Sequence, residues 1–217
     1  MMENYITLRK AVEQKKLSEE DCAYAVYLLT IVIKKLQYES HGGGHFNINP
    51  DTVMIQKKEG EEVKIMLLGE DTPHQACNGK PDFDTGALNQ CFRAPETFLG
   101  RFAPVSDFYS LGILLAYMVQ GFNPYKIDES MSKGEIQKVV RETEPQLKAS
   151  NSLGLIILKA IDKKVSKRFK DAEEMGFSLM DYLGMEKLKR FSCFDDAADR
   201  VSGVCNKDND LLDELKL

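Results

Sequence analysis

The sequence has 217 residues, of which 43% are hydrophobic and 29% are charged, and its formal net charge is −5. This size and apolar content suit one compact domain with a substantial core and a short appendage. A mildly acidic field does not attract nucleic acid or an anionic membrane surface, so we expect neither as a partner.

The cysteine usage and the N-terminus favour a cytoplasmic protein. The 5 cysteines are widely spaced and form no C-x-x-C pair, which gives no support for a zinc ribbon or a redox dithiol. The first residues lack the basic and apolar regions of a signal peptide. The longest strongly apolar run, Leu111 to Val119, is too short to cross a bilayer.

The predicted elements are mainly helical. Residues 5–14 have helical spacing, and Ser18 with the acidic residues after it predicts the start of a helix that continues to about Tyr38. That helix is apolar nearly all round, so we expect it to be buried. After the Gly42–Gly44 breaker, the sequence predicts a β-hairpin whose strands are 52–56 and 63–68. A long loop is expected at 69–93. Four helices are expected after it, at 107–120, 131–142, 152–162 and 171–183.

Two short motifs match enzyme signatures but lack their context. His41-Gly42-Gly43-Gly44 matches the oxyanion-hole loop of some esterases, yet the sequence has no G-x-S-x-G nucleophile elbow. Asp84-Thr85-Gly86 matches the aspartic-protease triplet, but the preceding Gly79 to Phe83 make a poor strand. Plain turns explain both motifs better.

An ordered series of motifs carries more information. His45-Phe46-Asn47-Ile48-Asn49-Pro50-Asp51-Thr52 resembles the catalytic loop of protein kinases, H-R-D-x-K-P-x-N. Val63–Gly69 resembles the strand that leads into D-F-G, and Ala94-Pro95-Glu96 matches A-P-E. Ser106–Gly112 resembles the start of the central helix of the C-terminal lobe, and Gly121–Tyr125 resembles the turn that ends it. Arg168 matches the arginine that pairs with the A-P-E glutamate. Any one of these is weak, but their shared order and spacing is specific.

The resemblance to the protein kinase superfamily covers residues 5–184 and only the C-terminal lobe. It implies a mainly α, kinase C-lobe-like domain at 1–184, with a short β-hairpin carrying the catalytic-loop-like segment, and an acidic extension at 185–217. It implies that Asp107 binds backbone N–H groups of that segment and that Glu96 and Arg168 form a buried pair. The residues with implied structural roles are His45, Gly69, Pro95, Glu96, Asp107, Gly112 and Arg168.

The departures from the family pattern concern its chemistry. The catalytic aspartate is matched by Asn47, the loop lysine by Asn49, the metal-binding asparagine by Thr52 and the D-F-G aspartate by Leu67. No G-x-G-x-x-G occurs, and we expect the upper, nucleotide-clamping lobe to be absent. The resemblance therefore implies no catalysis, no cofactor and no metal site, with a shifted metal site at Asp71 as an alternative.

The sequence favours a pseudokinase-like module for protein binding, scaffolding or regulation. A protein partner or a second copy would cover the face where an upper lobe docks, lined by Phe46, Leu67 and Leu68. The chain's own Leu211, Leu212 and Leu215 are suitable as a cover. Two alternatives stay open: half of a split kinase whose other lobe is a separate chain, and an enzyme with different chemistry that uses Glu70, Asp71, His74, Asp82 and Asp84.

Overall fold

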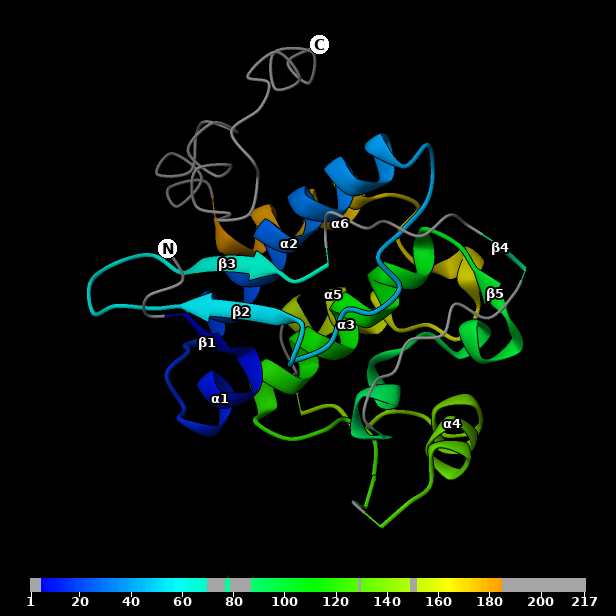
Figure 1. The fold of residues 1–217 in the computed structure, drawn as a ribbon. Coiled ribbons are helices and arrows are strands. Elements are labelled where there is room, and N and C mark those ends of the chain that lie inside the picture. The colour runs from blue at the N-terminus through cyan, green and yellow to red at the C-terminus, as the bar shows by residue number, and fades with distance from the viewer. Residues whose placement is uncertain (1–4, 70–76, 79–86, 129, 149–151, 185–217) are drawn as a thin grey trace.

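The computed structural model describes residues 5–69, 77–78, 87–128, 130–148 and 152–184. Its helices are α1 (Leu8–Glu13), α2 (Glu19–Glu39), α3 (Val105–Gln120), α4 (Lys133–Glu142), α5 (Ser152–Ala160) and α6 (Ala172–Leu183). Figure 1 shows these helices around α2 and α3, with a small sheet on one side. The mainly helical fold with a short hairpin is confirmed.

Helix α2 begins where its sequence predicts. The Ser18 hydroxyl accepts a hydrogen bond from the Asp21 N–H at 3.0 Å, and the Asp21 carboxylate accepts one from the Ser18 N–H at 3.0 Å. This capping box satisfies two N–H groups that the first turn leaves free. Residues on every side of α2 are buried, as its apolar content predicts.

The described strands form a three-stranded antiparallel sheet and a small separate pair. The predicted hairpin consists of β2 (Val53–Gln56) and β3 (Lys64–Leu67), and β1 (Ile6–Thr7) adds to the free edge of β2. Strand β1 was not predicted, because residues 5–14 have the spacing of one helix and only tertiary pairing with Met54 and Ile55 makes two of them extended. Strand β3 lies against α2, which positions the hairpin on the helical core (Figure 1).

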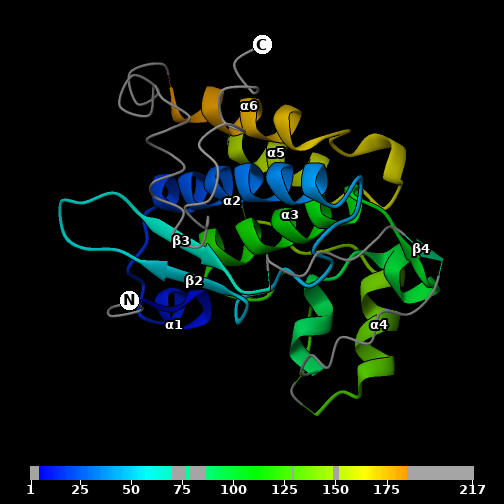
Figure 2. The ribbon, with the colours of Figure 1, turned by 45° about the horizontal axis from the view of Figure 1, so that its top comes forward.

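Four long helices pack side by side to form the core. Figure 2 shows the axes of α6, α5, α2 and α3 roughly aligned, and contacts join α2 to α6, α2 to α3, and α5 to both α3 and α6. Helices α3 and α5 approach closely at Gly112, where an added Cβ would lie 2.6 Å from the Cβ of Ala160. Only glycine fits there without a shift of one helix.

The predicted loop at 69–93 is partly structured, which corrects the sequence interpretation. It contains β4 (Cys77–Asn78), which pairs with β5 (Arg101–Phe102), and the 3-10 helix η1 (Ala87–Phe92). Two more 3-10 helices are η2 (Pro95–Leu99) and η3 (Val165–Lys167). The Gly and Pro residues behind the loop prediction lie before η1, whereas Cys91 and Phe92 are drawn into the core.

No helix in these ranges combines the length and the apolar character needed to cross a membrane. Helix α6 ends at Leu183, and the predicted extension at 185–217 lies outside the described residues. The domain boundary after residue 184 therefore stays a prediction.

Candidate functional site

The catalytic-loop-like segment, His45–Thr52, is held by one carboxylate from the first turn of α3. The Asp107 Oδ2 atom accepts a hydrogen bond from the His45 N–H at 2.8 Å, and its Oδ1 atom accepts one from the Phe46 N–H at 2.7 Å. Asp107 is fully buried, so these bonds replace the water that the carboxylate loses. The contact implied by the resemblance is present in the structure.

Burial and hydrogen bonding act on Asp107 in opposite directions. Burial raises the pKa of its carboxyl group to about 7, although the two backbone N–H groups work to lower it. A group with a raised pKa in the folded state takes up a proton more readily there than in the unfolded chain. Asp107 therefore binds the segment at a cost in stability whenever it is charged.

The backbone at Phe46 explains why this segment needs such an anchor. Phe46 has a φ of 58°, in the left-handed region that side chains other than glycine rarely adopt. This conformation turns its ring inward against Phe102, with the ring centroids 5.4 Å apart. Gly44 leaves room for the Phe46 ring, since an added Cβ at Gly44 would lie 2.8 Å from the Phe46 Cζ atom and 2.7 Å from the Asp107 Oδ2 atom.

The replaced polar positions of the segment bond to one another. The Asn49 Nδ2 atom donates to the backbone oxygen and to the Oδ1 atom of Asn47, both at 3.0 Å. The Asn49 Oδ1 atom accepts from the N–H groups of Asp51 at 3.0 Å and Thr52 at 3.2 Å. The Thr52 hydroxyl donates to the Asn47 carbonyl at 2.9 Å and accepts from the Asn49 N–H at 3.0 Å. These side chains are used to shape the loop.

Leu67, which the resemblance matches to the D-F-G aspartate, is part of the core. It ends β3 opposite Val53 and is 1% exposed. The next residue, Leu68, is 39% exposed, and its carbonyl lies 2.9 Å from the His45 Nε2 atom. Gly69 follows outside the strand, with a φ of 88°.

The face expected to be lined by Phe46, Leu67 and Leu68 needs a correction. The strand alternation places Leu67 inside, and the left-handed backbone of Phe46 turns its ring away from solvent. Among the three, only Leu68 is exposed. The three do not form one exposed apolar patch, and the predicted cover, Leu211, Leu212 and Leu215, lies outside the described residues.

The A-P-E-like glutamate forms the expected ion pair. The two Glu96 carboxylate oxygens accept from the Arg168 guanidinium at 2.7 and 2.9 Å. The Ser106 hydroxyl donates to Glu96 at 2.8 Å, the Arg168 Nε atom donates to the Asp162 carbonyl at 2.7 Å, and the guanidinium lies 4.8 Å from the Tyr109 ring centroid. Burial works to raise the pKa of Glu96, but Arg168 and Ser106 hold it below its ordinary value.

That pair joins distant parts of the chain. Pro95 and Glu96 open η2, whose proline at the first position needs no N–H partner, and Arg168 directly follows η3. The Arg168 side chain has no exposed surface. The pair therefore pins the activation-like segment to the core, since a buried charge that loses its partner is strongly unfavourable.

A second ion pair was missed by the sequence analysis. The Asp51 carboxylate accepts from Arg9 of α1 at 2.7 and 2.9 Å, and Asn89 of η1 bonds to Arg9 at 2.7 Å and to Asp51 at 2.8 Å. The hydrogen bonds from Arg9 lower the pKa of Asp51. Arg9, Asp51 and Asn89 lie far apart in sequence, and no local sequence pattern predicts that they are in contact. They tie α1 and η1 to the catalytic-loop-like segment.

Among the described residues, Leu67 does not fit the Mg²⁺ site that the kinase pattern implies. Mg²⁺ prefers oxygen ligands, and the Leu67 side chain has none. In the described ranges, no group of three or more His, Cys, Asp or Glu side chains is placed to hold a metal ion. The alternative candidates Glu70, Asp71, His74, Asp82 and Asp84 lie outside those ranges.

Comparisons with known proteins give distant similarities. No family model matches the chain. It is 28% identical over 111 residues, 50% of its length, to the Muscle M-line assembly protein unc-89 of Caenorhabditis elegans. It is 26% identical over 138 residues, 62% of its length, to Serine/threonine-protein kinase C of Synechocystis. The matched part is 1% of the first protein and 25% of the second.

Proposed function

We propose that this chain is a catalytically inactive protein kinase-like lobe that acts by binding another protein. The observation that carries the proposal is a contrast within one site. The anchors of a kinase C-lobe are in place around His45–Thr52, while the positions that would perform phosphoryl transfer hold Asn47, Asn49, Thr52 and Leu67.

The anchors support the kinase-like part of the proposal. Asp107 holds the loop backbone and Arg168 holds Glu96, each at the position that the resemblance implies. The distant similarity to a serine/threonine-protein kinase agrees with this arrangement. These contacts stabilise a lobe and do no chemistry themselves.

The replaced positions support the inactive part. Kinase chemistry needs a carboxylate to accept the proton of the substrate hydroxyl and an aspartate to hold Mg²⁺ against the phosphates. At Asn47 an amide replaces the first, and it accepts a hydrogen bond from Asn49. At Leu67 a buried alkyl group replaces the second. Loss of a general base alone lowers a rate by about 10²–10⁴-fold, and the missing metal ligand adds to this.

We propose a binding role because the contacts that hold the lobe together are kept while the groups for phosphoryl transfer are replaced. A stable lobe presents fixed surfaces, which suits a scaffold or a regulatory partner. The similarity to a protein named for assembly of the muscle M-line is in keeping with such a role. We propose a protein as the partner.

A thermal melt with nucleotide tests the proposal. A ligand at 100 times its Kd stabilises a protein by about 2.7 kcal/mol, which raises the Tm of a domain of this size by roughly 5–10 °C. We expect no rise with millimolar ATP, with or without Mg²⁺. An active protein kinase melted in the same buffers is the positive control.

A rise in Tm that requires both ATP and Mg²⁺ would contradict the proposal. It would mean that a metal–nucleotide site forms despite Leu67. The split-kinase and different-enzyme alternatives would then become the stronger readings. A rise with Mg²⁺ alone would point to a metal site of another kind.

A further inference from the structure

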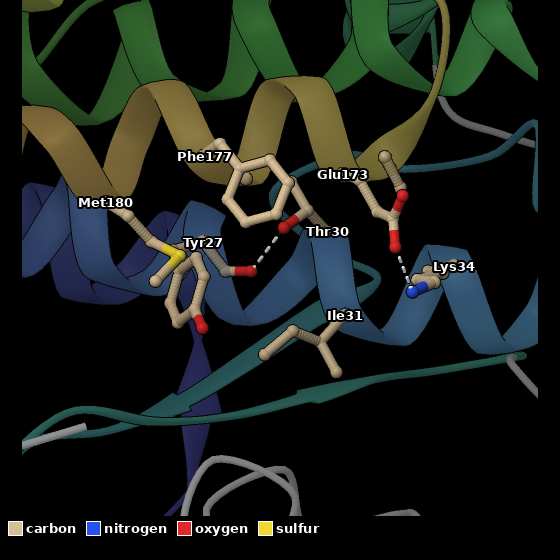
Figure 3. A pocket seen from close by; sticks show the side chains of 9 residues that line it. Tyr27, Thr30, Ile31, Lys34, Glu173, Phe177 and Met180 are labelled. Carbon is tan, nitrogen blue, oxygen red and sulfur yellow. Dashed lines mark hydrogen bonds and ion pairs between the residues drawn. The ribbon is translucent and has the colours of Figure 1, made fainter. Parts of the chain in front are cut away.

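Helices α2 and α6 form a groove on one side of the lobe. They run antiparallel, because Lys34 near the end of α2 pairs with Glu173 at the start of α6 at 2.5 Å, and Tyr182 at the end of α6 bonds to Glu19 at the start of α2. Figure 3 shows the groove between them. Its lining residues are Tyr27, Thr30, Ile31, Lys34, Ala172, Glu173, Gly176, Phe177 and Met180.

The floor and the wall of the groove are apolar. The helices come close at Gly176, where an added Cβ would lie 3.1 Å from the Thr30 Oγ1 atom. The Phe177 ring beside it is 61% exposed, and Ile31 and Met180 are only half-buried. An exposed aromatic ring next to half-buried aliphatic side chains is apolar surface that a further apolar group would remove from water.

Helix α6 ends one turn beyond Met180, which lines the groove. The Gly184 N–H donates to the carbonyl of Met180, a lining residue, at 3.1 Å. Residues 185–217 follow directly and carry Leu211, Leu212 and Leu215, at spacings that share one face of a helix.

We propose that residues 185–217 dock on the α2–α6 groove through Leu211, Leu212 and Leu215. The tether is long enough, since an extended chain from Gly184 to Leu211 spans up to about 90 Å, whereas α6 is only about 18 Å long. Attachment to the same chain gives the leucines an effective concentration of about a millimolar, so a weak contact suffices. This inference does not depend on the absence of catalysis.

The α2–α6 groove is a better docking site for the leucine segment than the face of Phe46, Leu67 and Leu68. Phe46 and Leu67 on that face are already buried by the lobe itself, so they need no cover. The α2–α6 groove has exposed apolar surface and lies where the leucine-bearing segment begins. A second copy of the chain or another protein in the groove is an outcome that the test below separates.

The experiment measures how fast a reporter thiol in the groove reacts with an alkylating reagent, in the full chain. Cys77, Cys193 and Cys205 are replaced by Ser. Cys22 and Cys91 are kept, because both are buried and burial raises the pKa of each thiol to about 12, which leaves them unreactive. The reporter is Ile31→Cys, which leaves Phe177 in place. The segment is tested as it is and with Leu211→Ser, Leu212→Ser and Leu215→Ser combined.

We expect the reporter to react roughly tenfold faster with the serine segment, because its reactivity follows the fraction of molecules with an open groove. The matched control is Leu155→Cys on α5, where the leucine is 69% exposed and outside the groove, and its rate should be equal with both segments. Equal rates at Ile31→Cys would overturn the proposal. Protection that is lost on dilution would also overturn it, because the occupant would then belong to another molecule.

Discussion

Asp107 is the residue on which the candidate site depends most. It is fully buried, makes no ion pair in the described part of the chain and holds the backbone of His45 and Phe46. Two opposing effects act on the charged form of this buried carboxylate. The two backbone donors stabilise the charged form, and the low dielectric around it destabilises the charged form. The raised pKa of Asp107 shows that the effect of burial is the larger of the two.

The first prediction concerns the pH dependence of stability due to Asp107. Its pKa is about 7 in the folded state, above its ordinary value of 3.8. The stability that it contributes is therefore fully present below about pH 4, is lost as pH rises toward 7, and is constant above. Relative to Asp107→Asn, the wild type should lose up to about 1.4 kcal/mol per pH unit in this window. Urea unfolding of both proteins between pH 5 and 8 measures the difference.

The comparison with Asp107→Asn cancels the other titrating groups. Glu96 acts in the opposite direction, because its lowered pKa gives stability that is lost only as pH falls below its ordinary value of 4.5. The amide adds a constant offset of about 1–3 kcal/mol to this difference, since its NH₂ group cannot accept one of the two N–H bonds, and the offset leaves the pH slope unchanged. A free-energy difference that does not change with pH would contradict the raised pKa.

The second prediction concerns the pair that holds the activation-like segment. Arg168→Ala should lower the free energy of unfolding by about 3–5 kcal/mol, because Glu96 stays buried without its partner. Lys170→Ala is the matched control, since that side chain is 78% exposed, and it should change stability by at most about 0.5 kcal/mol. Denaturant unfolding measures both.

The double variant Glu96→Ala with Arg168→Ala separates the pair from the space it fills. Removing both charges should cost less than the sum of the two single changes, because no uncompensated charge is left. Additive costs would show that the two side chains do not act as a pair.

At the scale of elements, the third prediction concerns the contact of α3 with α5. Gly112→Ala should lower stability by about 1–3 kcal/mol, since the new methyl group meets both Ala160 and Ile161 within 3 Å. Gly134→Ala in α4 is the matched control, because nothing lies within 4 Å of its added Cβ. That change should be neutral or stabilise the protein by up to about 1 kcal/mol. Equal effects at both sites would contradict the close packing of α3 on α5.

The elements also show how far the sequence predicts the fold. The Ser18 cap, the apolar α2 and the Gly121 stop of α3 are local signals, and the corresponding helices lie within a few residues of their predicted bounds. Strand β1 and helix η1 have no such local signal. Their conformations depend on pairing with β2 and on packing in the core, which only the folded chain supplies.

In the candidate site, too, some features are predictable from sequence and others depend on long-range packing. The contacts expected for Asp107, Glu96 and Arg168 are present, and they could be expected because each residue fills a fixed position in an ordered series of motifs. The resemblance does not reveal that the Phe46 ring turns inward, since this follows from a left-handed backbone stabilised by a residue distant in sequence. The bond of Arg9 to Asp51 and the α2–α6 groove likewise arise from long-range packing.

At the scale of the whole molecule, our proposal is a kinase-like lobe that keeps its supports and lacks its chemistry. Asp107 and the Glu96–Arg168 pair hold the segments that surround a kinase active site, and the polar side chains of the loop bond to one another. Leu67 adds to the core of the sheet and helix layer. We interpret this lobe as a framework whose surfaces, including the α2–α6 groove, carry its function.

Phosphoryl transfer from γ-labelled ATP tests this account most directly. The purified chain is incubated with Mg²⁺ and a general protein substrate, and the wild type is compared with Asn47→Ala. The account predicts no label above the protein-free background in either the chain or the substrate, with no difference between the two proteins. Labelling by the wild type that Asn47→Ala abolishes would contradict it, because the amide position would then belong to a working active site.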